Sequence, residues 1–365
     1  MSESSPKILA MYLPQFHEIP ENNTWWGNGF TEWTNVKKAC ALYRGHLQPR
    51  VPYKKNYYDL SDNAVMDQQM QMALKYGIDG FCIYHYWFKG KKLLEGPLER
   101  LLNEKKIILP FCICWANEAW TRTWDGDAGS KQILIAQEYG EEEDWICHFE
   151  YLCQFFQRPE YIKVQGKPLL VLYAAYEIKQ RDKMLRKWNE LAKERGFNGI
   201  FIVNTLRGSI SEQLPLYGDG IFDFEPFATL SRINNWQRKK IEKLYRGSRR
   251  QNYDHLYKVL DYDGFCELMM DRFIGIGSNH YLGMFVGWDN TPRRGIQTNL
   301  IYENNTPDIF EKYFNIQYKR SIEAQNEFLF INAWNEWGEG TFLEPDEKYM
   351  YGYLEAILNT KRRLE

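Results

Sequence analysis

Three glutamates lie close together near the end of the sequence, in the stretch INAWNEWGEGTFLEPD (331–346). Glu336, Glu339 and Glu344 share this stretch with two tryptophans and two glycines. Like charges at this spacing repel each other, unless a site shares a proton among them or holds a ligand between them. Two carboxylates in different environments can supply the acid and the base or nucleophile that glycoside cleavage requires. The stretch therefore indicates acid–base chemistry, with Glu336 and Glu339 as the candidate catalytic pair.

The spacing of this pair requires a break in the backbone. Glu336 and Glu339 are three residues apart, so a continuous strand would point them to opposite faces of a sheet. They converge if the strand ends between them, and Gly338 and Gly340 permit such a break. We expect the chain to leave its last strand near Trp337, with both carboxylates facing one cleft. The alternative is that one glutamate caps a helix or pairs with a lysine.

The elements that would position these residues alternate along the whole chain. Helical periodicity is clearest at 182–197 and 307–325, where apolar residues recur at intervals of three and four. Strands that alternate with such helices predict an α/β protein, and eight units predict a single (β/α)8 TIM barrel over residues 1–365. The eight apolar runs expected to form strands are 7–16, 80–88, 108–118, 168–177, 199–205, 220–227, 281–290 and 328–336.

Two long segments interrupt this alternation and are expected to be loop insertions at the mouth of the barrel. Residues 17–58 are rich in tryptophan and tyrosine, so we expect them to form a wall over the site. Residues 228–260 are polar, basic and poorly periodic. A solvated insertion is the expectation for this second segment, and a functional basic groove is the alternative.

Polar and aromatic side chains follow the apolar runs. The carboxyl ends of all barrel strands meet at one face, where barrel enzymes carry their catalytic groups. A sugar offers an apolar face to aromatic rings and hydroxyls to carboxylates, amides and indole N–H groups. Any one of these residues alone could instead be a turn former, a helix cap or a core filler. The predicted saccharide-binding residues are Tyr12, Gln15, His17, Trp26, Glu32, Trp33, Tyr84, His85, Tyr86, Trp115, Asn117, Glu118, Trp120, Arg122, Trp124, Asp125, Glu225, Trp288, Trp334, Asn335, Trp337 and Glu344.

Composition and motifs argue against other classes of function. A net charge of -2 and a pI near 6.4 give no basic footprint for nucleic acid. The six histidines show no paired metal spacing, and there is no glycine-rich phosphate fingerprint or G-x-S-x-G motif, so we expect neither a metal nor a cofactor. No signal peptide or membrane span is recognisable, which favours a soluble cytoplasmic protein unless a leader was removed.

Three motifs resemble those of the WbsX family, whose members are usually encoded with bacterial surface-polysaccharide genes. They are YLPQFHEIPENNTWWGNGFTEWTNV (12–36), CWANEAWTRTWDG (114–126) and WNEWGEGTFLEP (334–345). That family is similar in turn to glycoside hydrolase family 99, the endo-α-mannosidases, through the barrel and a Glu-Trp-x-Glu element. The mannosidase element has histidine where this chain has Gly338.

This resemblance implies a retaining reaction without an ordinary carboxylate nucleophile. Glu336 would deprotonate the sugar 2-hydroxyl, which attacks the anomeric carbon to give a 1,2-anhydro sugar, and Glu339 would act as general acid and then as general base. The leading hypothesis is thus a glycoside hydrolase that acts on an α-linked oligosaccharide or polysaccharide.

Two alternatives stay open at this stage. The first is a glycosyltransferase or transglycosylase of O-antigen or lipopolysaccharide biosynthesis, and the second is a non-catalytic saccharide-binding barrel. The sugar, the linkage, endo or exo action, the use of a nucleotide sugar and the oligomeric state are not determined by the sequence.

Overall fold

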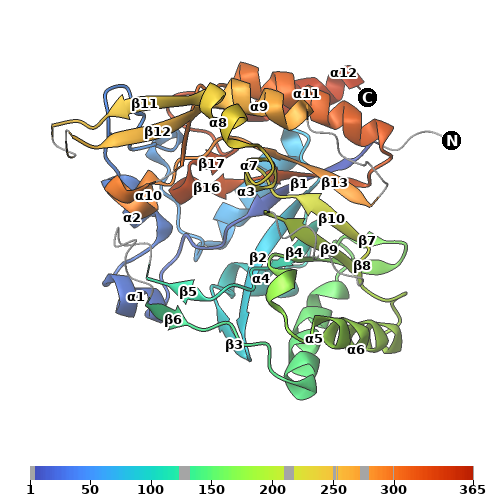
Figure 1. Ribbon diagram of the computed structural model, residues 1–365. Coiled ribbons are helices and arrows are strands. Elements are labelled where there is room, and N and C mark those ends of the chain that lie inside the picture. Colours follow the sequence, from blue (N-terminus) through green and yellow to red (C-terminus); the bar gives the residue numbers. More distant parts are fainter. Residues whose placement is uncertain are drawn as a thin grey trace.

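The fold is a closed barrel of eight parallel strands (Figure 1). The computed structural model describes residues 5–122, 132–208, 218–249, 252, 254–271, 279–298 and 300–364. The first strand pairs with the second and with the last, which closes the barrel. Each of the eight predicted runs overlaps one of these strands, so the predicted TIM barrel is confirmed. The barrel strands are β1 (Lys7–Tyr12), β2 (Gly80–Phe88), β4 (Phe111–Trp115), β8 (Lys167–Leu172), β9 (Phe201–Leu206), β10 (Gly220–Asp223), β13 (His280–Phe285) and β15 (Phe328–Asn332).

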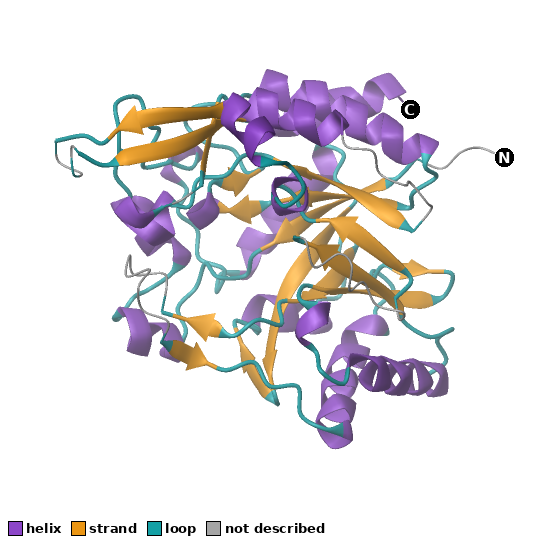
Figure 2. Cartoon of the chain, in the orientation of Figure 1, coloured by secondary structure: helices purple, strands orange, loops and turns teal. Residues whose placement is uncertain are grey.

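Helices cover the outside of the barrel (Figure 2). Helix α6 buries Met184, Leu185, Trp188 and Ala192, the apolar face that the sequence period predicts, and it ends just before Gly196, which has a left-handed φ of 87°. The longer helices between barrel strands and after the last one are α3 (Asn63–Lys75), α4 (Gly96–Asn103), α5 (Glu142–Phe156), α6 (Arg181–Glu194), α9 (Tyr262–Asp271), α11 (Pro307–Glu323) and α12 (Gly352–Leu364).

The core fills the barrel and the layer beneath its helices. All nine residues of β2 and all five of β4 are buried, which is expected for parallel strands covered on both faces. Inside the barrel, the rings of Phe222 and Phe330 stack with their centroids 4.2 Å apart. This packed interior fixes the strand ends, and the loops that follow them build the mouth.

The segment between β1 and α3 lies over the mouth. It contains α1 (Pro20–Trp26), α2 (Glu32–Lys38) and the short helix η1 (Tyr53–Lys55). A capping box formed by Thr31 and Thr34 starts α2. Trp33 then packs against Phe16 and Trp337, with ring centroids 4.7 and 5.4 Å apart. This aromatic packing fixes α2 next to the chain that follows β15.

The segment after β10 contains more regular structure than its sequence suggests. It forms α7 (Phe227–Leu230), α8 (Asn235–Ile241), β11 (Glu242–Arg246) and β12 (Leu256–Asp261), and β12 pairs with β14 (Ile301–Glu303). Buried residues of this small sheet pack against Leu42 and Tyr43 of the first long segment. The sequence obscures the sheet because its strands are short and carry charged residues on both faces.

Among the described residues, we find no helix whose length and apolar character would let it cross a lipid bilayer.

Candidate active site

The chain after β15 turns sharply over the mouth of the barrel. It forms β16 (Asn335–Glu336), the short helix η5 (Trp337–Glu339) and β17 (Thr341–Phe342), which pairs with β16. Gly340 has a left-handed φ of 67°, and a Cβ there would lie 2.9 Å from the backbone nitrogen of Asp289, so both conformation and space favour glycine. The last barrel strand ends at Asn332, earlier than the expected break near Trp337. The difference arises because residues 335–342 form their own hairpin at the mouth.

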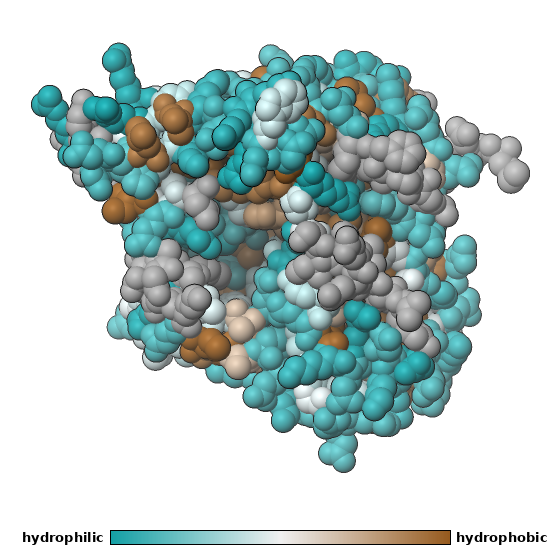
Figure 3. Space-filling view, viewed as in Figure 1, coloured by the Kyte–Doolittle hydropathy of each residue, from teal (hydrophilic) through white to brown (hydrophobic). Residues whose placement is uncertain are grey.

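Glu336 and Glu339 line one cavity of about 250 Å³. Figure 3 shows the molecule hollowed between the region of α10 (Thr291–Arg294) and that of β5 (Trp120–Thr121) and β6 (Ile133–Ile135). The same cavity is lined by Leu13, Gln15, Trp26, Tyr84, Tyr86, Ala116, Glu118, Ala119, Trp120, Thr121, Leu134, Tyr173 and Arg293. Its wall therefore combines carboxylates, an arginine and five large aromatic rings.

Arg293 joins three carboxylates at the mouth. Its terminal nitrogens lie 3.0 Å from Glu336 Oε2 and 2.7 Å from Glu339 Oε1, and its Nε lies 2.8 Å from Glu32 Oε1. The guanidinium is nearly buried, with 7% of its side chain exposed. Because one cation faces three carboxylates, full ionisation of all three would leave a net negative charge in a poorly hydrated site.

This crowding changes the acidity of Glu336 and Glu339. Burial raises the pKa of Glu336 to about 8, and Arg293 opposes the shift. Burial likewise raises the pKa of Glu339, again against the effect of Arg293. A carboxyl with a raised pKa can hold a proton at neutral pH, so the pair can combine a protonated and an ionised group.

Because Gly338 has no side chain, it leaves room for Arg293 to reach both Glu336 and Glu339. A Cβ atom at position 338 would lie 1.7 Å from Glu32 Oε1 and 2.8 Å from Arg293 Nε. The Glu32–Arg293 ion pair thus fills the space that a side chain at 338 would need. This gives a physical reason for glycine at position 338.

Aromatic rings form much of the remaining wall, and a second arginine, Arg207, supports one of them from outside the lining. Gln15 donates from Nε2 to the Tyr86 hydroxyl at 2.9 Å, which fixes both side chains on the cavity surface. Arg207 lies over the Tyr173 ring at 3.7 Å and contacts Glu118 at 2.9 Å. These contacts hold polar groups beside exposed ring faces, an arrangement suited to a polyhydroxylated ligand.

Only part of the predicted binding set reaches this cavity. Among the predicted saccharide-binding residues, the structure places Gln15, Trp26, Tyr84, Tyr86, Glu118 and Trp120 on its wall. Glu32 contacts the site through Arg293, and Arg122 lies nearby, where it donates to the Trp25 carbonyl at 3.0 Å. Trp124 and Asp125 lie outside the described residues.

The remaining predicted residues do not line the cavity, and many support the mouth from behind. Asn335 and Asn117 bond to the backbone of Leu13 and Ala174, respectively. Glu225 accepts from Thr229, and His85 contacts His148. The residues in this group are Tyr12, His17, Trp33, His85, Trp115, Asn117, Glu225, Trp288, Trp334, Asn335, Trp337 and Glu344.

Glu344 is the third glutamate of the stretch 331–346, and it lies behind the hairpin formed by β16 and β17. It accepts hydrogen bonds from Trp334, Trp337, Tyr58 and Gln69 at 2.7–3.1 Å. Burial raises its pKa to about 7, although these four donors act in the opposite direction. Glu344 therefore braces Trp337 next to Glu336.

The predicted saccharide-binding set omits Arg293 and Tyr173. Tyr173 directly follows β8, so the strand-end rule places it at the mouth, and it lines the cavity. Arg293 lies in α10, several residues beyond the end of β13. The sequence feature that could have identified it is the basic pair of Arg293 and Arg294 in the loop after the seventh strand, since the cluster of glutamates needs a cation.

The WbsX sequence family, whose model is described as "Glycosyltransferase WbsX", matches residues 8–357. The chain belongs to the WbsX family. This member is also 34% identical over 353 residues to "Uncharacterized protein WxcX" of two strains of Xanthomonas campestris pv. campestris. That alignment covers 96% of this chain and 48% of WxcX, so the chain spans about half the length of the curated relatives it matches.

Solved structures show where the WbsX barrel belongs among known folds. The GH99 endo-alpha-mannosidase of Bacteroides thetaiotaomicron is similar with a TM-score of 0.53 at 15% identity, covering 98% of this chain and 96% of the mannosidase. A second structure, described as "Glycoside hydrolase-like protein", has a TM-score of 0.59 at 10% identity and covers 98% and 94%. The WbsX chain therefore has a barrel fold like that of glycoside hydrolase family 99.

Proposed function

We propose that this WbsX chain is a retaining glycoside hydrolase of the endo-α-mannosidase type that cleaves an α-linked glycan or polysaccharide. One observation carries the proposal: Glu336 and Glu339 line the same aromatic cavity at the barrel mouth, and both contact Arg293. Paired carboxylates with raised pKa values suit acid–base cleavage, and the ring faces suit a pyranose. The family resemblance and the barrel fold support the same reading.

The two glutamates take different steps in this proposal. Glu336 accepts the proton of the sugar 2-hydroxyl, and O2 attacks the anomeric carbon while Glu339 protonates the departing oxygen. Glu339 then takes a proton from water, and the water oxygen attacks the anomeric carbon and opens the 1,2-anhydro ring. Glu336 returns its proton to O2. Glu339 is the more accessible of the two, with 21% of its side chain exposed against 7% for Glu336, which suits contact with a leaving group and with water.

The test is release of reducing ends from α-mannan and from bacterial surface polysaccharide. Glu336→Gln and Glu339→Gln should each lower kcat by about a hundredfold or more, because each removes a group that transfers a proton. Glu143→Gln is the matched control, since Glu143 is exposed on α5, and it should retain wild-type activity. Full activity in either catalytic variant would contradict the proposal.

A second candidate is glycosyl transfer, because the matching family is described as a glycosyltransferase. The same carboxylate pair could then activate an acceptor hydroxyl or release a leaving group. Incubation with nucleotide sugars and an acceptor glycan, with detection of released nucleotide, separates the two activities. Nucleotide release that depends on Glu339, without hydrolysis of any glycan, would select the transferase.

A further inference from the structure

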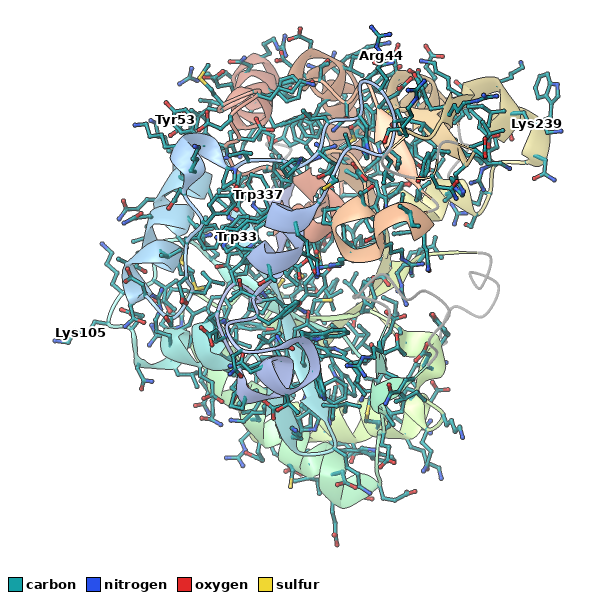
Figure 4. The ribbon with its side chains drawn as sticks, turned by 90° about the vertical axis from the view of Figure 1, so that its left-hand side faces the viewer. Trp33, Arg44, Tyr53, Lys105, Lys239 and Trp337 are labelled. Carbon is teal, nitrogen blue, oxygen red and sulfur yellow. The ribbon has the colours of Figure 1, made fainter. Side chains whose placement is uncertain are left out.

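A second cavity lies on the other side of Trp337 from the catalytic pair. It has a volume of about 470 Å³ and opens between η1, α3 and the chain after β17. Trp337 and Glu344 are buried members of its wall, and Tyr53 and Tyr351 are half-buried. Figure 4 shows Trp337 near the middle of this face and Tyr53 farther out, toward the upper left. The cavity therefore extends from the catalytic hairpin toward the surface.

The wall of this cavity resembles that of a sugar-binding site in its chemistry. Tyr53 and Tyr351 pack edge to face with ring centroids 5.6 Å apart, and the apolar side chains of Val65 and Met72 lie beside them. Amides on the wall come from Asn56, Gln68 and Gln69. Rings for an apolar sugar face and amides for hydroxyl groups are thus within one cavity.

Two neighbouring lysines give the cavity its second distinctive feature. Lys54 and Lys55 are exposed members of its wall, and both have left-handed backbone conformations, with φ of 56° and 55°. Such a conformation is costly for a residue with a side chain, and glycine or asparagine usually occupies it. In the described part of the chain, neither lysine forms an ion pair. Backbone strain of this kind clusters at ligand sites, and here it presents two lysines at the cavity wall.

The strained turn is held in place by the chain that follows the catalytic hairpin. The backbone nitrogen of Tyr53 donates to the carbonyl of Pro345 at 2.9 Å, and that of Glu347 donates to Val51 at 2.9 Å. These bonds keep the backbone of both lysines at the rim. The Lys54 side chain lies over the Tyr53 ring, with Nζ 5.3 Å from the ring centroid. The turn is a fixed part of the cavity.

We propose that this cavity is an accessory site for an anionic sugar unit, one that carries a carboxylate, in a polysaccharide bound by the chain. The ring of the sugar stacks on Tyr53 or Tyr351, its hydroxyls meet Asn56 and Gln68, and its carboxylate meets Lys54 and Lys55. The choice of a saccharide ligand rests on the proposed function, while the choice of an anion rests on the lysines.

The carboxylate of Glu344 does not oppose this assignment. It lies at the buried end of the cavity, where four donors from the protein already satisfy it, whereas the lysines lie at the exposed end. An anionic group at the rim is therefore separated from Glu344 by the length of the sugar ring. Because Glu344 and the sugar would both contact Trp337, the bound unit would lie directly behind the catalytic hairpin.

The test measures binding in a Glu339→Gln background, where turnover cannot affect the result. The probes are an α-linked oligogalacturonate, a neutral α-manno-oligosaccharide of equal length, and UDP, each titrated calorimetrically at low and at high salt. The key variant is Lys54→Asn with Lys55→Asn, because asparagine removes the charge and still accepts a left-handed backbone. The matched control is Lys105→Asn with Lys106→Asn, an exposed lysine pair that lies elsewhere on the surface (Figure 4).

We expect the Lys54/Lys55 double variant to weaken oligogalacturonate binding about tenfold or more at low salt, and the control pair to change it less than about twofold. Tyr53→Ala should weaken binding of both oligosaccharides. Equal affinity in the two double variants, absence of oligogalacturonate binding, or tighter lysine-dependent binding of UDP would each overturn the assignment. Failure of the proposed hydrolysis would instead appear as absence of reducing ends, which this binding assay does not measure.

Discussion

The carboxylate of Glu32 occupies the space above Gly338: a Cβ atom added to Gly338 would lie 1.7 Å from Glu32 Oε1. Glu32 is buried and holds Arg293, which in turn contacts Glu336 and Glu339. The conformation of the proposed catalytic pair thus depends on a glycine between its two members.

Gly338→Ala should therefore disturb both stability and activity. The added methyl group must displace the Glu32–Arg293 ion pair, which we expect to lower the free energy of unfolding by about 1–3 kcal/mol. Chemical denaturation measures this change. Gly208→Ala is the matched control, because no described residue lies within 4 Å of a Cβ at that position. An unchanged unfolding free energy in Gly338→Ala would show that the Glu32–Arg293 ion pair can move aside without a loss of stability.

Arg293→Lys tests whether one guanidinium organises the carboxylates. A lysine ammonium keeps the positive charge but cannot reproduce the fixed, forked contacts of arginine with three carboxylates. We expect kcat/KM for glycan cleavage to fall by about a hundredfold, while circular dichroism shows a folded protein. Arg44→Lys, at an exposed position, serves as control and should leave kcat/KM unchanged. Wild-type kcat/KM in Arg293→Lys would show that the guanidinium of Arg293 is not needed to organise the carboxylates.

The pH dependence of activity should reflect the raised pKa of Glu336. Glu336 must be ionised to accept the 2-hydroxyl proton, so kcat/KM should rise with pH until it passes about 8, well above the ordinary value of 4.5. Glu339 must be protonated to act as acid, and its raised pKa lets it keep its proton above the range of an exposed glutamate. The measurement is the kcat/KM profile from pH 4 to 10. A rising limb near pH 4 would show that Glu336 is not the base or is not buried during catalysis.

Glu344→Gln should destabilise the protein without removing a catalytic group. The carboxylate accepts from two indole N–H groups, a tyrosine hydroxyl and an amide, so the NH2 group of glutamine must face at least one donor. We expect the free energy of unfolding to fall by about 2–3 kcal/mol. The exposed neighbour Glu347 provides the control, and Glu347→Gln should stay within about 0.5 kcal/mol of wild type. A difference of that same small size for Glu344→Gln would mean that the carboxylate is not satisfied as described.

The barrel itself could be predicted because each strand is an apolar run bounded by turn residues, and each helix shows its period in the sequence. Met184, Trp188 and Ala192 illustrate this, since their spacing alone identifies the buried face of α6. The small sheet of β11, β12 and β14 was not predictable in the same way. Its strands pair with segments distant in sequence, and their alternation is too short to distinguish from a polar loop.

The site was predictable in its location and less so in its membership. Strand-end position indicates that a residue lies near the mouth, but it does not say whether the side chain faces the cavity or the packing behind it. Trp120 lines the cavity, whereas Trp115 on the same segment is in the core. Glu344 likewise shares a stretch with the catalytic pair yet points behind it. Arg293 was missed because its position depends on the turn after β13, which sequence periodicity does not describe.

The most direct test of the central claim is a crystal structure of the Glu339→Gln variant with α-linked manno-, rhamno- or fuco-oligosaccharides. We predict that a pyranose lies between Trp26, Trp120 and Tyr86, with its 2-hydroxyl within hydrogen-bond distance of Glu336 and a glycosidic oxygen next to position 339. An oligosaccharide ordered elsewhere on the molecule, with the Glu336 cavity empty under saturating ligand, would contradict the account.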